Sequence, residues 1–200
     1  MTQNKRIIGI TGNSGSGKTT VANIITEGCG HKINADNIVH KLMEPNQMAY
    51  KKIVAAFGPH ILDDSIAESP APINRKKLRQ IVFTDEEKRT KLESILHPMV
   101  IEEVLSEIAA VNASLITVDA VLLVESGLHH HCDELWLVTA PADIRLERIT
   151  SRDNLSGEDA QTRMRNQRDT AHIAAIADVI IENNTDNIES LKSQIQKAMA

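Results

Sequence analysis

The feature that most constrains this chain is a glycine-rich octet close to its N-terminus. Residues 12–19 read Gly-Asn-Ser-Gly-Ser-Gly-Lys-Thr and fit the pattern G-x-x-x-x-G-K-S/T. An apolar run at 7–10 precedes the octet, and a segment of helical character at 20–25 follows it. Glycines allow tight turns that point several N–H groups at one anion, and the following helix adds the positive end of its dipole. The octet therefore predicts a phosphate-binding P-loop between a strand and a helix, with a nucleoside triphosphate as ligand.

The residue types inside the octet predict individual contacts. Lys18 is long enough to reach the β- and γ-phosphates, and Thr19 can offer its hydroxyl to Mg²⁺. The alternative is a glycine-rich turn that precedes an ordinary helix and binds nothing. The residues expected to bind ATP are Gly12, Asn13, Ser14, Gly15, Ser16, Gly17, Lys18, Thr19 and Thr20.

Short, continuous apolar runs recur along the chain and predict five strands. Such runs are typical of strands that are buried on both faces of a parallel sheet. Helical segments lie between them, which gives the alternation of a three-layer α/β fold, and 200 residues suit one such domain. We therefore expect a single P-loop NTPase domain over residues 1–200 with a five-stranded parallel sheet and Trp136 in its core. The expected strands are residues 6–11, 31–34, 115–118, 134–138 and 178–182.

The interval between the second and third expected strands is long and predicts an insertion. Residues from about 36 to 113 read as several helices rather than as one crossover. Helix starts are marked by side chains that can accept hydrogen bonds from backbone N–H groups, and in one case by a proline. These starts are Asn74, the capping box at residues 84–87, Pro141, Ser156 and Asn187.

Composition narrows the classes of partner. The net charge is −5, which argues against a nucleic-acid-binding surface but not against a phosphorylated small molecule. Cys29 and Cys132 show no disulfide spacing, and the run of histidines at 129–131 lacks a second ligand pair at zinc spacing. No signal peptide and no membrane-spanning run is apparent. We expect a cytoplasmic monomer or small homo-oligomer that binds neither nucleic acid nor membrane.

Two acidic residues follow expected strands. Asp119 ends a short apolar strand in the manner of a Walker-B acid, whose carboxylate helps to hold Mg²⁺, often through water. Asp36 follows the second strand, and ligands of open α/β sheets bind beyond the C-terminal ends of strands. A carboxylate there can accept the proton of an attacking hydroxyl during phosphoryl transfer. Each acid could instead cap a helix, which after Asp36 is expected over residues 37–43.

Arginine is concentrated after the fourth expected strand. Arg145, Arg148 and Arg152 are spaced i, i+3, i+7 and so line one face of a helix. Three more arginines follow at positions 163, 165 and 168. We expect a lid over about residues 145–170 that closes on phosphates and excludes water; the alternative is a solvated face with glutamate–arginine pairs. The Asn-Lys-x-Asp pattern of a GTPase is absent.

With these residues assembled, the chain resembles the dephospho-CoA kinase family from the first strand to about residue 184. The P-loop is common to many families, but three further patterns in this order are more specific. They are Asp-x-Ile-x-His at residues 36–40, His97-Pro98, and the segment 177–183 that ends in Asn183.

The resemblance implies an activity and residues to carry it. The family transfers the γ-phosphoryl group of ATP to the 3′-hydroxyl of dephospho-CoA with Mg²⁺, which gives coenzyme A and ADP in the last step of coenzyme A synthesis. By position, Asp36 matches the general base, Lys18 the P-loop lysine, and Arg148 and Arg152 the lid arginines. The residues that the resemblance implies for binding the acceptor are Asp36, His40, Arg75, His97 and Glu125.

The chain also departs from the family's usual pattern. Residues 121–125 read Val-Leu-Leu-Val-Glu where the family usually has Pro-Leu-Leu-Phe-Glu, a segment that shapes the acceptor site. Two alternatives therefore stay open. One is another small P-loop kinase that acts on a nucleoside or nucleotide. The other is a non-catalytic ATP-binding protein, which would bind ATP without forming ADP when the acceptor is added.

Overall fold

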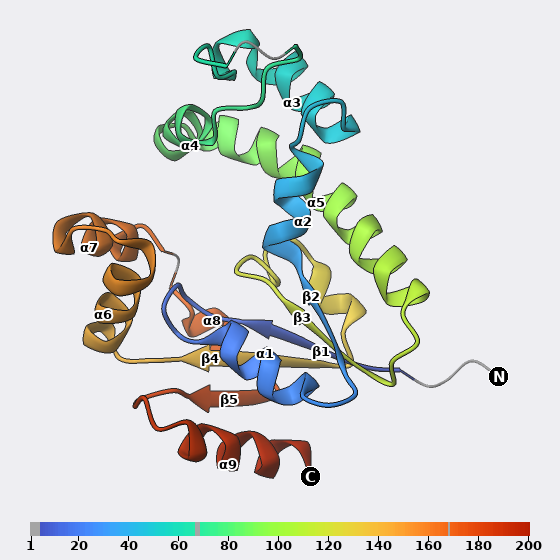
Figure 1. Ribbon diagram of the computed structural model, residues 1–200, viewed down its shortest axis with the longest axis vertical. Coiled ribbons are helices and arrows are strands. Elements are labelled where there is room, and N and C mark those ends of the chain that lie inside the picture. Colours follow the sequence, from blue (N-terminus) through green and yellow to red (C-terminus); the bar gives the residue numbers. More distant parts are fainter. Residues whose placement is uncertain (1–4, 67–68, 168) are drawn as a thin grey trace. The chain divides into compact units, whose positions relative to one another are not determined.

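The computed structural model describes residues 5–66, 69–167 and 169–200 and contains one five-stranded, all-parallel sheet. The strand order is β2-β3-β1-β4-β5, with β1 in the middle (Figure 1). The predicted α/β fold with a five-stranded parallel sheet is confirmed, and each strand lies within one residue of its expected bounds. The strands are β1 (Arg6–Thr11), β2 (His31–Asn34), β3 (Leu115–Asp119), β4 (Glu134–Thr139) and β5 (Val179–Glu182).

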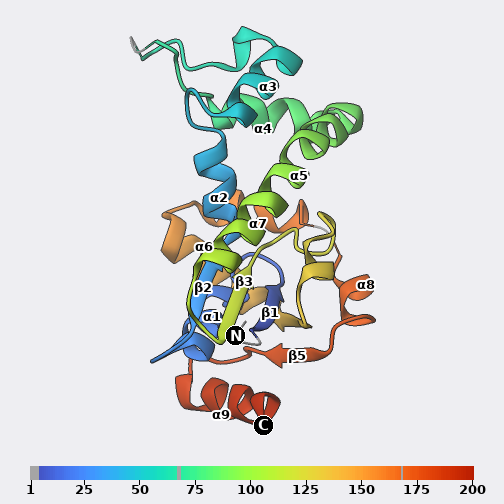
Figure 2. The same ribbon diagram turned by 90° about the vertical axis from the view of Figure 1, so that its right-hand side faces the viewer.

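The described chain forms two compact units. One comprises the segment up to Asn34 together with Val111–Ala200 and holds the whole sheet. The other, Ala35–Ala110, is helical. Figures 1 and 2 show the elements of each unit from two sides.

Two helices, one at each end of the chain, pack against the sheet through a continuous apolar core. Side chains of α1 and α9 join those of β1, β4 and β5, and Trp136 is fully buried among them, as expected. On the opposite side of β1, a Cβ atom added to Gly9 would lie 2.7 Å from the Leu123 side chain, so the 120–131 segment covers that face closely. The helices of this unit are α1 (Lys18–Thr26), α6 (Ala142–Asp153), α7 (Gly157–Arg165), α8 (Ala171–Ala174) and α9 (Ile188–Met199).

The helical unit has a core of its own. Its centre is formed by buried side chains such as Ile53, Phe57 and Leu78, with Leu96 from the longest helix. Tyr50 is buried and its hydroxyl donates to the carbonyl oxygen of Ala71 at 2.6 Å, which ties the loop before α4 to α3. The elements are α2 (Ala35–Leu42), α3 (Met48–Phe57), the 3₁₀ helix η1 (Pro59–Ile61), α4 (Arg75–Thr84) and α5 (Glu86–Ala110).

Most expected helix starts are confirmed. The Asn74 side chain accepts from the backbone N–H groups of the second and third residues of α4 at 3.1 Å each. Ser156 and Asn187 cap α7 and α9 in the same way, and Pro141 directly precedes α6. Asp36 lies inside the first turn of α2, since that helix begins at Ala35 rather than at residue 37.

The prediction of a capping box at residues 84–87 is wrong. Thr84 is the last residue of α4, and its hydroxyl donates back to the carbonyl oxygen of Gln80 at 3.2 Å. The carboxylate of Asp85 caps α5 instead by accepting from the N–H of Lys88 at 3.1 Å. A single residue separates the two helices, so Thr84 is still helical and bonds within its own turn.

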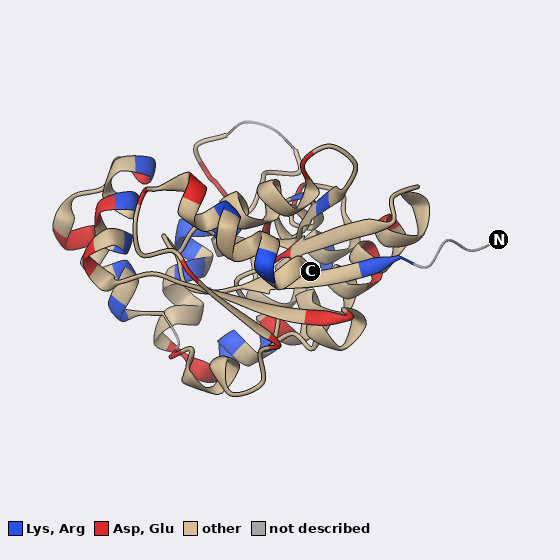
Figure 3. Ribbon diagram, turned by 90° about the horizontal axis from the view of Figure 1, so that it is seen from below, with Lys and Arg blue, Asp and Glu red and all other residues tan. Residues whose placement is uncertain are grey.

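Charged positions are mixed along the chain, and Figure 3 shows blue and red residues interspersed on the ribbon. Among the described helices, none combines the length and the apolar character needed to cross a bilayer.

Candidate active site

The P-loop connects the C-terminal end of β1 to the start of α1, as expected. Gly17 adopts a left-handed conformation, with φ at 95°, and precedes the first residue of α1. A Cβ atom added to Gly12 would lie 2.2 Å from the carbonyl oxygen of Val138 in β4, so a larger residue would push the loop off the sheet. Lys18 is 9% exposed and its ammonium donates to the carbonyl oxygen of Asn13 at 3.3 Å. The lysine therefore folds back over the loop that it follows.

Thr19 and Asp119 form a hydroxyl–carboxylate pair. Thr19 Oγ1 donates to Asp119 Oδ2 at 2.7 Å, although the two residues are 100 positions apart. Asp119 is only 2% exposed and is the last residue of β3, opposite Ile10 of β1 in register. Turns follow it rather than a helix. The structure thus brings together the two side chains that the sequence predicted as cation ligands.

The three arginines of α6 have different partners. Arg145 contacts the P-loop and the segment after α7, with Nε 3.1 Å from the carbonyl oxygen of Ser14 and Nη2 bonded to Gln167 Oε1. Arg152 pairs with the neighbouring Asp153, with Nε 2.7 Å from Oδ1. A shared helical face therefore did not predict the same partners for Arg145 and Arg152.

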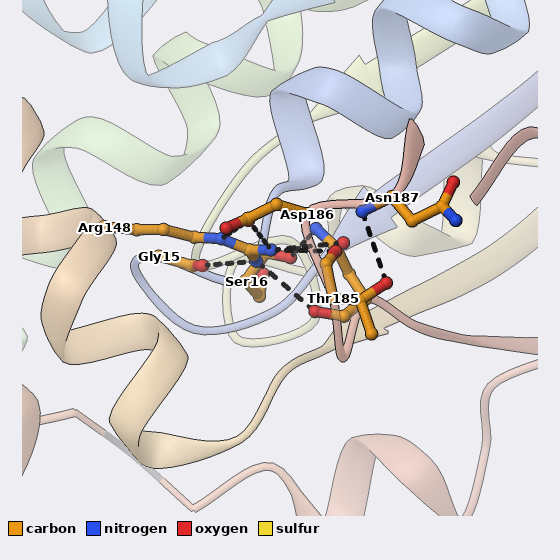
Figure 4. A network of polar contacts seen from close by, with 7 residues as sticks. Gly15, Ser16, Arg148, Thr185, Asp186 and Asn187 are labelled. Atoms are coloured by element: carbon orange, nitrogen blue, oxygen red, sulfur yellow. Dashed lines mark hydrogen bonds and ion pairs between the residues drawn. The ribbon is translucent and has the colours of Figure 1, made fainter. Parts of the chain in front are cut away.

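Arg148 is the centre of a polar network next to the P-loop. Its guanidinium donates to the Asp186 carboxylate at 2.9 Å, to the side-chain oxygen of Asn183 at 3.4 Å and to the carbonyl oxygen of Gly15 at 3.4 Å. Figure 4 shows the side chain reaching from α6 to both the P-loop and the segment that follows β5. The segment also contributes the carbonyl oxygen of Thr185, at 3.3 Å.

Two open cavities meet this network. The larger, about 550 Å³, lies between the start of α1 and the face of α6 that carries Arg148 and Arg152. The smaller, about 150 Å³, lies beside Arg148 and Thr20 and is also lined by Asn183 and residues 185–188. The large cavity has a P-loop and arginine lining suited to phosphates. The small one adjoins it and mixes polar and apolar walls, as a nucleobase requires.

The expected lid arginines are partly held by acids. Asp153 accepts from Arg152 and also from Arg163 of α7, and the hydrogen bond from Arg152 is the main reason that the pKa of Asp153 is lowered. The predicted alternative of acid–arginine pairs is therefore present here, through Asp153 rather than through glutamate. Arg165 contacts Thr162 of its own helix, and position 168 lies outside the described residues.

The residues expected to bind the acceptor fall in both units. Within the helical unit, His40 and Arg75 line one cavity of about 280 Å³. Partial burial lowers the pKa of His40 and the nearby charge of Arg75 lowers it further, while Asp36 acts in the opposite direction. His97 lies on α5, half-buried, directly before Pro98.

Glu125 belongs to the unit that holds the sheet and lies in the turns after β3. It is half-buried and near His129, whose pKa is lowered mainly by burial. Burial raises the pKa of the Cys132 thiol to about 12, and neither Cys29 nor Cys132 is in a disulfide. Within the described ranges, no group of three or more His, Cys, Asp and Glu side chains is placed to hold a metal.

Asn183 and Asp186 are site residues to which the sequence reasoning gave no role. Asn183 was part of the family-like segment 177–183, and it follows β5 at the C-terminal end where such sheets bind ligands. That position was the available signal. Asp186 has no such signal, because its contact with Arg148 and its place in the walls of both cavities arise only from the folded structure.

Comparisons with known proteins cover nearly the whole chain. A family model described as "Dephospho-CoA kinase" matches residues 6–189. A dephospho-CoA kinase from Prochlorococcus marinus is 35% identical over 188 residues, which are 92% of this chain and 90% of the relative. The match to a crystal structure of a protein from Thermus thermophilus covers 98% of this chain and 96% of that protein's chain. The two are 29% identical, and the TM-score is 0.80. For a dephospho-CoA kinase from Campylobacter jejuni the identity is 28% and the TM-score 0.66, with the same coverage.

Proposed function

The chain belongs to the dephospho-CoA kinase family, and from this membership we infer that it transfers a phosphoryl group from ATP to dephospho-CoA. The observation that carries the inference is the family match over residues 6–189, which spans both the P-loop and the helical unit. The family expected from the sequence is confirmed. The match favours dephospho-CoA over a nucleoside as acceptor, and an enzyme over a non-catalytic ATP-binding protein.

We propose that the P-loop and the two cavities beside it bind ATP. The amides of residues 12–20 and the Lys18 ammonium would hold the triphosphate in the larger cavity, whose wall includes Gly15 and the stretch from Gly17 to Thr20. The base would enter the smaller cavity between Thr20 and Asn183. Arg152, at the far side of the larger cavity, would exchange Asp153 for the transferring phosphoryl group, and Arg148 would border both ligand portions.

Thr19 and Asp119 fit a divalent cation. Hydroxyl and carboxylate oxygens are the ligands that Mg²⁺ prefers, and the two atoms lie 2.7 Å apart at the end of β3. We propose that this pair holds Mg²⁺, with Asp119 bound directly or through water. The ion supplies positive charge that neutralises the phosphates during transfer.

Asp36 is the proposed general base. It lies in the first turn of α2 and is exposed, so its carboxylate can accept the proton of the 3′-hydroxyl of the acceptor. His40, Arg75 and His97 are proposed to bind dephospho-CoA, and Glu125 with them. The cavity that His40 shares with Arg75 supports this role, since a cation suits the diphosphate of the acceptor.

Several broader expectations remain part of the proposal. They are a single kinase domain whose helical insertion binds the acceptor, a lid over about residues 145–170, a cytoplasmic location and a monomer or small homo-oligomer. The free thiols of Cys29 and Cys132 are in keeping with a reducing compartment.

The test is ADP release from ATP with different acceptors. We expect turnover with dephospho-CoA and none with nucleosides or nucleoside monophosphates. Turnover with a nucleoside monophosphate and none with dephospho-CoA would assign the chain to a different kinase activity. If ATP binds but no acceptor leads to release of ADP, the non-catalytic alternative is favoured.

A further inference from the structure

Three consecutive carbonyl groups of the P-loop each accept a hydrogen bond from a side chain outside the loop. The donors come from α6 and from the residue that follows β5, more than a hundred positions along the chain. The pairs are Arg145 Nε with Ser14 O at 3.1 Å, Arg148 Nη1 with Gly15 O at 3.4 Å, and Asn183 Nδ2 with Ser16 O at 2.8 Å. We call these three side chains the carbonyl clamp.

Fixing a carbonyl also fixes the amide that follows it. A trans peptide unit is planar, so its C=O and N–H bonds point in opposite directions. Clamping the carbonyls of Ser14 and Ser16 from outside therefore turns the N–H groups of Gly15 and Gly17 away from the clamp. The N–H of Ser16 donates to the carbonyl oxygen of Asn13 at 3.2 Å and closes the loop on itself.

The clamp is itself anchored on rigid elements. Asn183 is 7% exposed, and its backbone N–H donates to the carbonyl oxygen of Thr139 in β4 at 2.8 Å. Arg145 is half-buried and held at its other end by Gln167. A Cβ atom on Gly15 would lie 2.7 Å from the carbonyl oxygen of Arg145, so the loop packs directly against α6.

We propose that Arg145, Arg148 and Asn183 are positioning residues that hold the P-loop amides in their anion-binding orientation before the triphosphate arrives. This rests on the proposed function, since it takes the triphosphate of ATP as the ligand of the loop. Donors that are already oriented need no reorganisation when the ligand binds, which strengthens binding. In this role the two arginines act on the loop's backbone through its carbonyl groups, which for Arg148 is additional to its place in the wall of the ATP cavity.

Binding of inorganic tripolyphosphate tests the clamp without base, ribose or acceptor. Asn183→Leu removes a donor with no change in charge, and Arg145→Met removes another that is half-buried. Each should weaken tripolyphosphate and ATP binding by about tenfold in calorimetry, the effect of losing one such hydrogen bond. Lys192→Met on α9, where the lysine pairs with Glu189, removes the same charge as Arg145→Met and should bind normally.

Hydrogen exchange gives a second readout that a general loss of stability would not produce. Amides of residues 12–19 should exchange faster in Asn183→Leu and Arg145→Met, while those of the central strands stay protected. If Asn183→Leu does not fold, the affinity and the hydrogen exchange of Arg145→Met test the clamp on their own.

Unchanged tripolyphosphate affinity in folded variants would overturn the clamp. So would an equal loss in Lys192→Met, which would indicate a long-range effect of charge. A wild-type protein that binds tripolyphosphate through the clamp but does not phosphorylate dephospho-CoA would overturn the proposed function alone. The two failures are therefore distinguishable.

Discussion

Asp36 is the residue on which the chemistry of the proposed reaction depends most directly. It is exposed and lies two residues after the end of β2. An amide cannot take up the proton of the acceptor hydroxyl, so Asp36→Asn should lower kcat by about 100-fold or more. ATP binding should persist, because the P-loop is unchanged. Steady-state ADP release with dephospho-CoA and calorimetric ATP binding measure the two effects separately.

The matched control for this variant is Asp64→Asn. Asp64 is an acidic residue of the same helical unit, and its carboxylate pairs with Lys77 at the surface. It should retain normal kcat. If Asp36→Asn also retains normal kcat, Asp36 is not the base.

At this scale, local patterns could be predicted and tertiary partners could not. The P-loop and the caps at Asn74 and Asn187 can be recognised from neighbouring residues alone, and the structure confirms them. Arg145 and Arg148 share a helical face, yet one bonds to Gln167 and the other to Asp186. Such pairings depend on which distant segment packs nearby, which periodicity within one helix does not specify.

At the scale of elements, the edge of the sheet at β5 has a side chain bonded to its backbone. Gln194 of α9 accepts from the N–H of Glu182 at 3.2 Å and donates to its carbonyl oxygen at 3.0 Å. One amide thus satisfies both backbone groups of a residue in an edge strand, which would otherwise be open to another chain.

Removing this amide should destabilise the chain. Gln194→Ala should lower the free energy of unfolding by about 1–2 kcal/mol, since two hydrogen bonds are lost at a partly solvated site. Urea unfolding measures the change. Gln196→Ala, an exposed glutamine of the same helix, should be close to neutral. Equal stability of the two variants would show that the contact with Glu182 contributes nothing.

Where β1 pairs with β4, a carboxylate makes the stability of the fold depend on pH. Glu134 accepts from Arg6 Nε at 2.6 Å and from Trp136 Nε1 at 2.8 Å. The hydrogen bond from Arg6 is the main reason that the pKa of Glu134 is lowered from its usual value. A lowered folded-state pKa gives stability that is present above the unfolded-state pKa and lost as pH falls through the folded one.

Unfolding in urea at pH 7 and near pH 4 tests this dependence. The wild-type protein should lose stability at the lower pH, and Glu134→Gln should lose less, because it has no carboxylate to protonate. Glu103→Gln, an exposed position on α5, should follow the wild type. An acid-induced loss of the same size in Glu134→Gln would show that other groups account for it.

The strands could be predicted closely because each is a continuous apolar run buried in the sheet. The boundary between α4 and α5 was harder to predict. Thr84 and Glu87 satisfy the spacing of a capping box, but spacing alone does not reveal that the preceding helix extends through Thr84. Helix boundaries depend on where packing against Leu78 and its neighbours stops, which is a property of the folded unit.

At the scale of the whole molecule, alternation of strands and helices predicted the α/β class but not the strand order β2-β3-β1-β4-β5. Order depends on where each crossover returns to the sheet, and the short strands have no residue pattern that specifies a neighbour. The long interval between β2 and β3 predicted separate helices, and the compact helical unit Ala35–Ala110 occupies it.

The proposal that the helical insertion binds the acceptor leads to a kinetic prediction. Arg75 lies in the helical unit and lines its cavity with His40, whereas the P-loop belongs to the unit that holds the sheet. Arg75→Met should raise KM for dephospho-CoA by about tenfold, as expected for one lost charge-assisted contact, and leave KM for ATP unchanged. Arg89→Met is the control, because Arg89 is in the same unit and pairs only with Glu86 among the contacts described for its side chain. Equal rises in both KM values for Arg75→Met would mean that this arginine does not act through the acceptor, and a rise for ATP alone would place nucleotide binding in the helical unit.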